Sequence, residues 1–202
     1  MYLNFADLEP HARYRAMVST VVPRPIAWVS SCSADGVLNL APYSFFNVAS
    51  CNPPVLSVTQ IRPRTMNDKD TLRNLRETGD CVVNIVSRAN MDKMNASCAG
   101  YAPEEDEFEL CDIAQVASQN VSVPGVAAAS VRFECRLREV IEVSKEAMGG
   151  SIMLLDVLGV YADDSVVAQG QILTDELDIV GKMGGDNYCQ TGDVFSVTRA
   201  SV

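Results

Sequence analysis

The sequence lacks several features on which common enzyme classes depend. It has a single histidine, His11, in 202 residues, so a Ser-His-Asp relay or a multi-histidine metal site is hard to build. It contains no GxGxxG, GxxxxGK[ST], HExxH or GxSxG motif, which leaves a Rossmann site, a P-loop, a zinc protease and an α/β-hydrolase without support. Because His11 lies among charged residues, we interpret it as a solvated surface residue.

Positive charge and long apolar runs are also scarce. The 16 Lys and Arg against 26 Asp and Glu give a formal net charge of -10. Nucleic-acid affinity depends on clustered cations, so we expect no nucleic-acid partner. No apolar stretch approaches the length that spans a bilayer, and we expect no membrane partner. Residues 1–14 show no basic segment followed by an apolar core, so we expect no signal peptide.

The seven cysteines include no CxxC pair and leave an odd number. Several lie in apolar runs, where Cys behaves as a small buried hydrophobe. A reduced, cytoplasmic protein fits this usage better than a disulfide framework or a zinc site. The length and the 48% hydrophobic content favour one domain, residues 1–202.

Strand patterns dominate the chain. We predict strands at residues 26–31, 37–41, 54–61, 80–87, 130–144 and 151–161. The strand at 130–144 alternates, which places Arg132 and Glu134 on its solvent face. We expect the tail at 169–195 to be irregular. The pattern predicts a mainly β fold, an antiparallel barrel with a few inserted helices.

Three segments carry helical patterns, namely residues 10–17, 69–78 and 89–98. The second has Asp68 or Asp70 available as a cap for its first turn, and Gly79 is a natural stop. Residues 104–109 form a short acidic run, which we interpret as a solvated loop or helix face in preference to a metal site.

One constellation points to a ligand. Residues 41–47 (APYSFFN) form an aromatic block with hydroxyl and amide groups, and a cluster of basic and hydroxyl residues follows the strand at 54–61. An aromatic wall beside a cationic corner suits a flat ring with a phosphate tail, which is the shape of FMN. A solvated helix entry with ordinary capping explains the same residues equally well.

Several blocks, taken in order, resemble the flavin-reductase-like, FMN-binding split-barrel family, and most of all its flavoredoxin-like branch. They read PRPIAWVSS, DGVLNLAPYSFFNVAS, NPPVLSV and KDTLRNLRETGDCVVNIV, followed by MNAS, DEF and GGDNY. The resemblance implies a Greek-key split β-barrel that binds FMN and acts as an oxidoreductase. It also implies NADH or NADPH as a possible co-substrate, and a homodimer with the flavin near the interface.

The resemblance further implies which residues hold FMN. They are Arg24, Tyr43, Ser44, Phe45, Phe46, Asn47, Arg64, Thr65, Lys69, Asp70, Thr71, Asn84 and Tyr188. Basic and hydroxyl members would hold the phosphate, and the segment from Tyr43 to Asn47 would pass along the ring. The flavin performs hydride transfer itself, so no catalytic side chain and no metal site are expected.

One departure from the family pattern leaves the electron donor open. Many NAD(P)H:flavin reductases of this superfamily have an Asp-His pair before a late strand, whereas residues 149–156 contain no histidine. An electron carrier supplied by a protein partner, like flavoredoxin, is the first alternative. A non-catalytic module for another flat ligand, such as haem or a deazaflavin, is the second. Haem is disfavoured because His11 lies outside the expected pocket.

Overall fold

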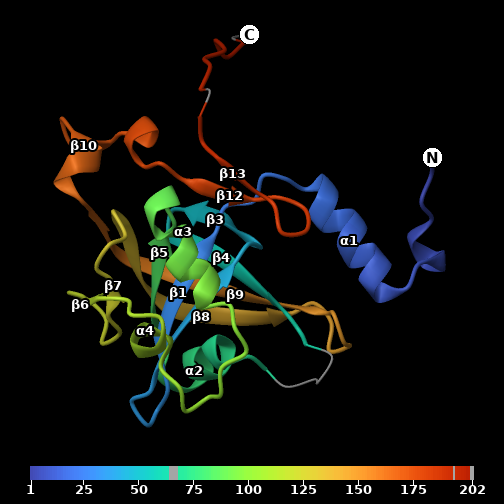
Figure 1. Ribbon diagram of the computed structural model, residues 1–202, viewed down its shortest axis with the longest axis horizontal. Helices are drawn as coiled ribbons and strands as arrows, with labels where there is room; N and C mark the ends of the chain where they lie inside the picture. The colour runs from blue at the N-terminus through green and yellow to red at the C-terminus, as the bar shows by residue number, and fades with distance from the viewer. Residues whose placement is uncertain (64–67, 193, 201–202) are drawn as a thin grey trace.

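The structure is a computed structural model that describes residues 1–63, 68–192 and 194–200. Its centre is a seven-stranded sheet in the order β2-β1-β5-β8-β9-β4-β3, which curls with helices around it (Figure 1). The strands are β1 (Ala27–Cys32), β2 (Leu38–Tyr43), β3 (Phe46–Cys51), β4 (Pro54–Ile61), β5 (Asp80–Ile85), β8 (Val131–Glu142) and β9 (Gly150–Ala162). All neighbouring strands pair antiparallel, so the predicted mainly β, antiparallel architecture is confirmed.

The two edge strands of this sheet, β2 and β3, are consecutive in the chain. Only Ser44 and Phe45 separate them, and Phe45 O accepts a hydrogen bond from Thr59 N at 2.8 Å. One segment therefore runs from one edge of the sheet to the other and curls it. The sequence did not predict β3, because its residues are mostly exposed and carry no apolar alternation.

Both faces of the central strands are buried. Along β1, Ala27 and Val29 belong to the cluster inside the curl together with Tyr43 and Val58. Trp28, between them in sequence, belongs to a second cluster on the outer face. Strand alternation sends neighbouring side chains to opposite faces, and here each face meets its own core.

The helices cover the outer face and the ends of the sheet. They are α1 (Pro10–Thr20), α2 (Asp70–Thr78), α3 (Met91–Ala96) and α4 (Glu107–Leu110), and a 3-10 turn at Arg88–Asn90 precedes α3. The predicted helices at 10–17, 69–78 and 89–98 are therefore present with shifted ends. None in the described part of the chain is both long and apolar enough to cross a bilayer.

The ends of α2 follow simple backbone chemistry. Leu72 and Leu75 are buried, as their spacing predicts. The helix ends at Gly79, whose φ of 83° is readily adopted only by glycine, and Gly79 N donates to Leu75 O. The expected aspartate cap is wrong, because the N-cap residue is Lys69 and no side chain caps the first turn.

The remaining strands are short hairpins. They are β6 (Gln115–Val116) with β7 (Gly125–Val126), β10 (Val167–Ala168) with β11 (Gln171–Ile172), and β12 (Val180–Lys182) with β13 (Tyr188–Gln190). The tail that we expected to be irregular therefore contains the β12–β13 hairpin. This hairpin is attached to the start of the barrel by an isolated antiparallel β-bridge between the backbones of Arg24 and Lys182.

The predicted solvent face of the strand at 130–144 is wrong for Arg132 and Glu134. Both are buried, because the segment between α4 and β8 covers that part of the sheet. Arg132 donates to Ala129 O at 2.8 Å and lies 3.8 Å from the centroid of the Tyr161 ring. The Glu134 carboxylate accepts from the backbone of Gln119 and from Asn120.

Candidate functional site

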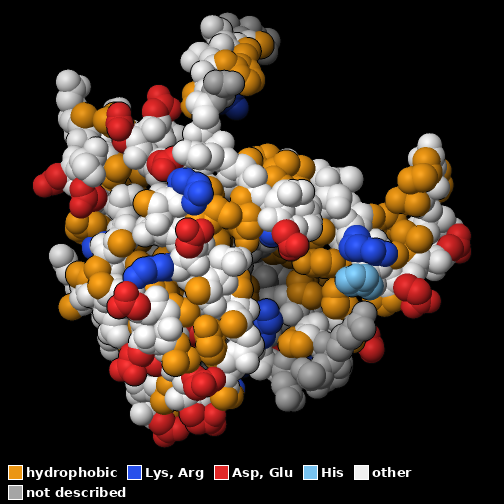
Figure 2. Space-filling model, in the orientation of Figure 1, with side chains coloured by type: hydrophobic (Ala, Val, Ile, Leu, Met, Phe, Trp, Pro, Cys, Tyr) orange, Lys and Arg blue, Asp and Glu red, His pale blue; other side chains and the backbone are white. Residues whose placement is uncertain are grey.

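A hollow of about 590 Å³ opens beside the start of α2, and we call it the α2 hollow. Its walls come from the second half of β2, the entry to α2 and the segment between α3 and α4. Its lining residues are Asn39, Ala41, Pro42, Tyr43, Pro63, Lys69, Asp70, Thr71, Ser97, Cys98, Ala99, Gly100, Tyr101 and Glu107. The face of the molecule is hollowed between α3 and α1 (Figure 2).

A second hollow, of about 320 Å³, lies beside α1, and we call it the α1 hollow. Its lining residues are Met17, Val18, Val21, Pro23, Arg24, Pro25, Ser44, Phe45, Phe46 and Asn47. Tyr43 lines the α2 hollow and its neighbour Ser44 lines the α1 hollow. The fold thus divides the predicted ligand residues between two adjacent hollows on either side of the β2–β3 connection.

The ammonium group of Lys69 is the clearest charge in the α2 hollow. No carboxylate of the described residues forms a salt bridge with it, and its Nζ lies 5.9 Å from the centroid of the Tyr43 ring. The adjacent Asp70 carboxylate is already paired with Arg73 at 2.5 Å. Lys69 immediately precedes α2, where unpaired backbone N–H groups and the helix dipole also favour an anion.

Tyr43 gives the hollow a neutral aromatic wall. Its hydroxyl is buried, and no group among the described residues meets it in good hydrogen-bond geometry. Burial raises the pKa of the Tyr43 phenol far above its usual value, and the nearby Thr71 hydroxyl offsets part of that rise. The phenol therefore stays protonated in any ordinary buffer.

Thr71, predicted as a phosphate ligand, already uses its side-chain hydroxyl in a hydrogen bond within the protein. It is fully buried, and its hydroxyl donates to Asn39 Oδ1 at 2.8 Å. The neighbouring Glu107 carboxylate accepts from Asn39 Nδ2 at 2.8 Å and from Leu40 N at 2.9 Å. Glu107 is only 5% exposed, so the interpretation of the acidic run as a solvated face is wrong at this residue.

Arg24, predicted to be displayed toward the ligand, is instead 7% exposed. Its Nε donates to Ser44 Oγ at 3.3 Å. Its terminal nitrogens donate to three backbone carbonyls, those of Val18, Val21 and Met183. Arg24 is therefore part of the wall of the α1 hollow, and its guanidinium joins α1, the β2–β3 connection and the segment after β12.

Asn84 lines neither hollow. Its Nδ2 donates to Trp28 O and its Oδ1 accepts from Val126 N, both at 2.8 Å. The amide is fully buried and holds β5 to its neighbours, so the structure does not bring it to the predicted site.

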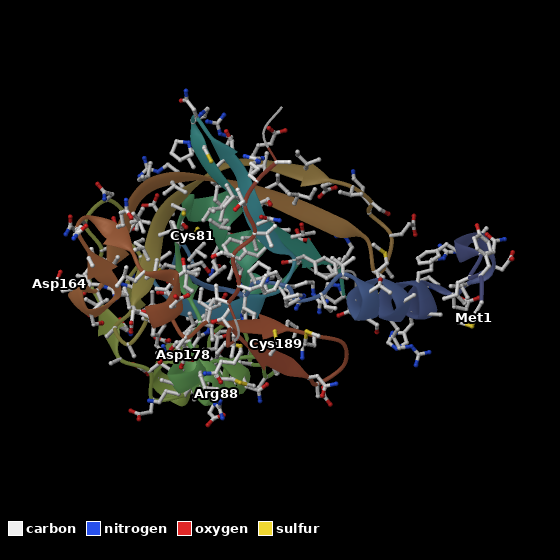
Figure 3. The ribbon with its side chains drawn as sticks, turned by 90° about the horizontal axis from the view of Figure 1, so that it is seen from above. Met1, Cys81, Arg88, Asp164, Asp178 and Cys189 are labelled. Atoms are coloured by element: carbon white, nitrogen blue, oxygen red, sulfur yellow. The ribbon has the colours of Figure 1, made fainter. Side chains whose placement is uncertain are left out.

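Tyr188 lies on the β12–β13 hairpin, which Cys189 marks between α1 and α3 (Figure 3). The Lys182 ammonium lies 3.9 Å from the centroid of the Tyr188 ring and donates to Gly185 O at 2.6 Å. Burial raises the pKa of the Cys98 thiol, and Lys69 and Lys182 both act against that rise. Cys98 itself lines the α2 hollow, so the charge of Lys182 on the hairpin acts on a group of this hollow.

Arg64 and Thr65 lie outside the described residues. Sequence reasoning missed other residues of the α2 hollow, namely Asn39, Ser97, Cys98, Tyr101 and Glu107. The DGVLNLAPYSFFNVAS, MNAS and DEF blocks of the family resemblance contain Asn39, Ser97 and Glu107, but the resemblance assigns no ligand role to these residues. Ser97 also accepts the indole N–H of Trp28 at 2.9 Å, which ties the wall of the hollow to the outer core.

Comparison with known proteins gives a consistent picture. The family model described as "Flavin reductase like domain" matches residues 18–173. The uncharacterised protein YwrF of Bacillus subtilis is 36% identical over 206 residues, which cover 100% of both chains. An uncharacterised protein of Halalkalibacterium halodurans is 34% identical and covers 100% of this chain and 98% of its own.

Solved structures share the same fold. Nitrilotriacetate monooxygenase component B of Bacillus cereus has a TM-score of 0.92 and 31% identity, covering 98% of each chain. The 2-nitrobenzoate 2-nitroreductase NbaA of Pseudomonas fluorescens has a TM-score of 0.90 and 27% identity, covering 99% of this chain and 96% of its own. Flavoredoxin of Desulfovibrio vulgaris, at 18% identity and a TM-score of 0.78, agrees in fold. The predicted split barrel is confirmed.

Proposed function

Because the chain belongs to the flavin reductase like family, we propose that it is an FMN-binding flavoprotein oxidoreductase with its flavin in the α2 hollow. The observation that carries the proposal is Lys69, an ammonium without a carboxylate partner among the described residues, at the N-terminal end of a helix beside a neutral aromatic wall. The chain has a net charge of -10 and therefore an excess of carboxylates that could pair with a lysine. A cation in a hollow without such a partner favours an anionic ligand.

The volume and lining of the hollow also suit such a ligand. Small-molecule pockets commonly enclose roughly 300–1,000 Å³ and combine apolar walls with a few placed polar groups. Here Ala41, Pro42 and Tyr43 supply the apolar wall, and Lys69 supplies the charge for a phosphate. The Asp70 carboxylate is already paired with Arg73, and the Glu107 carboxylate is held by N–H donors of β2, so neither is paired with Lys69.

Bound FMN would accept a hydride and pass electrons onward, which is chemistry that belongs to the cofactor. The protein holds the phosphate, keeps an aromatic face against the ring and excludes water from that face. The buried phenol of Tyr43 stays neutral and adds no charge to the site. None of these tasks needs a side chain that transfers a proton.

We further propose that NADH or NADPH reduces the flavin directly and that the chain works as a homodimer in the cytoplasm. The seven cysteines, all free, are in keeping with a reducing compartment. The alternative, a carrier reduced by a protein partner, is supported by the lack of any histidine in β9.

The visible spectrum of the purified protein tests these proposals. A yellow protein that releases FMN, or a colourless one that binds added FMN stoichiometrically, supports the flavin site. Bleaching by NADH or NADPH without oxygen then identifies a reductase, and a spectrum unchanged by either identifies a carrier. Failure to bind FMN in any form would overturn the proposal. Sedimentation of the protein with FMN measures the oligomeric state.

A further inference from the structure

The α2 hollow rests on a chain of buried hydrogen bonds that begins at Glu107. This glutamate is the first residue of α4, and its carboxylate accepts from two groups of β2, Asn39 Nδ2 at 2.8 Å and Leu40 N at 2.9 Å. No cation of the described residues forms a salt bridge with Glu107. Two N–H donors thus take the place of an ionic partner.

An ionised carboxylate can only accept hydrogen bonds, and this fixes the direction of every later one. Asn39 must turn its Nδ2 toward Glu107, so its Oδ1 faces the other way. That oxygen accepts from Thr71 Oγ1 at 2.8 Å and from Ser31 Oγ at 3.4 Å. Ser31 Oγ in turn accepts from Asn74 Nδ2 at 3.1 Å.

The same series of hydrogen bonds joins all three walls of the hollow. Glu107 belongs to α4 and ends the segment whose residues 97–101 form one wall. Asn39 belongs to β2, which forms the second. Thr71 belongs to the first turn of α2, directly after Lys69 and Asp70, and Asn74 to its second turn. One carboxylate therefore holds the proposed phosphate-binding residue in register with the other two walls.

We propose that Glu107 is a positioning residue of this site: its ionised carboxylate orients Asn39, and through Asn39 it holds the α2 entry and the α3–α4 segment at the spacing that FMN requires. The inference rests on the proposed function, because it concerns how the flavin hollow is assembled. Glu107 itself is not a catalytic residue.

Isosteric substitutions test the direction of the hydrogen bonds. In Glu107→Gln, the new amide can accept from Leu40 N, but it then presents an N–H to Asn39 Nδ2. Asn39 must turn over, and Thr71 and Ser31 lose their acceptor. We expect roughly tenfold weaker FMN binding, equivalent to about 1.4 kcal/mol. Asn39→Asp sets two carboxylates against each other and should weaken binding at least as much.

The double variant Glu107→Gln/Asn39→Asp restores a donor for every acceptor, and it moves the negative charge from position 107 to position 39. The amide introduced at position 107 would donate to the carboxylate introduced at position 39, and that carboxylate would accept from Thr71 and Ser31. We expect the double variant to bind FMN within about twofold of the wild type, which by the same conversion is about 0.4 kcal/mol. Glu109→Gln, on the same helix at an exposed position, is the matched control and should change nothing.

Fluorescence titration with FMN, together with a thermal unfolding curve for each variant, decides the matter. Loss of affinity in the single variants with recovery in the double variant supports the proposal. Unchanged affinity in Glu107→Gln, or a double variant no better than the weaker single one, overturns it. If the wild type binds no FMN, the proposed function fails instead. Recovery in the double variant keeps the test decisive even where a single variant unfolds.

Discussion

Arg24 donates its Nε–H to Ser44 Oγ at 3.3 Å, so a buried guanidinium is attached to the short segment that separates the two hollows. The other hydrogen bonds of the Arg24 side chain go to backbone carbonyls at the end of α1 and after β12. A residue that the sequence suggested as a ligand contact is therefore a clamp between three parts of the chain.

Replacing Arg24 should cost stability and spare ligand selectivity. Arg24→Met removes the side-chain donor of three buried or partly buried carbonyls, and we expect a loss of about 2–3 kcal/mol in the free energy of unfolding. Affinities for FMN and riboflavin should fall by the same factor. Urea unfolding and parallel titrations measure both effects. A stable variant that loses only FMN would show instead that Arg24 contacts the phosphate.

Replacing Lys69 should have the opposite signature. Lys69→Met keeps most of the length of the side chain and removes the charge, so FMN should bind roughly 10–100-fold more weakly, as for loss of a charge-assisted hydrogen bond. Riboflavin, which has no phosphate, should bind as before. Lys93→Met, at an exposed lysine on α3, is the matched control. Equal losses for both flavins would contradict a phosphate contact.

The pH dependence of stability should report Glu107. Burial raises the pKa of its carboxyl above the ordinary value of 4.5, against the hydrogen bonds from Leu40 N and Asn39. The folded protein therefore holds this proton more tightly than the unfolded chain, and the stability contributed by the protonated form is lost as pH rises from 4.5 through the raised pKa. Relative to Glu107→Gln, the wild type should lose stability over that window. Urea unfolding at a series of pH values measures the free energy of unfolding of both proteins. Equal pH dependence in the wild type and Glu107→Gln would contradict a raised pKa at Glu107.

Ser97 should stabilise the fold through the hydrogen bond that its hydroxyl accepts from Trp28. In Ser97→Ala the indole N–H of fully buried Trp28 loses its partner, and we expect a loss of about 1–3 kcal/mol in the free energy of unfolding. Adding Trp28→Phe removes the orphaned donor, so the double variant should lose less than the two single effects combined. Chemical denaturation of the four proteins completes the cycle, and strict additivity would contradict the coupling.

Much of the fold follows from local patterns in the sequence. The runs at 54–61, 80–87 and 151–161 became strands because β-branched and apolar residues suit a buried sheet, and Gly79 ended its helix by adopting a positive φ. The edge strand β3 carries no such pattern, since only one of its sides is paired and most of its side chains meet solvent. Its strand conformation comes from pairing with β4.

The site was harder to predict, because its key contacts join distant parts of the chain. Lys69 and Tyr43 could be recognised by residue type. The roles of Asn39 and Glu107 depend on a hydrogen bond across 68 positions, and a buried glutamate in an acidic run looks like its solvated neighbours. Arg132 and Glu134 followed the expected alternation and were buried by a loop whose path the pattern does not reveal.

The connection between β2 and β3 also has a topological meaning. The sheet forms a ring whose last join is covalent, through Ser44 and Phe45, rather than a ladder of hydrogen bonds between two edge strands. A circular permutation that opened the chain at this join would leave every strand pairing intact. The two edge strands would no longer be held together, so the sheet could flatten and the two hollows could separate. New termini at the exposed turn around Gly36 would leave that join whole. The barrel is therefore closed at one covalent connection, and the proposed ligand site lies beside that connection.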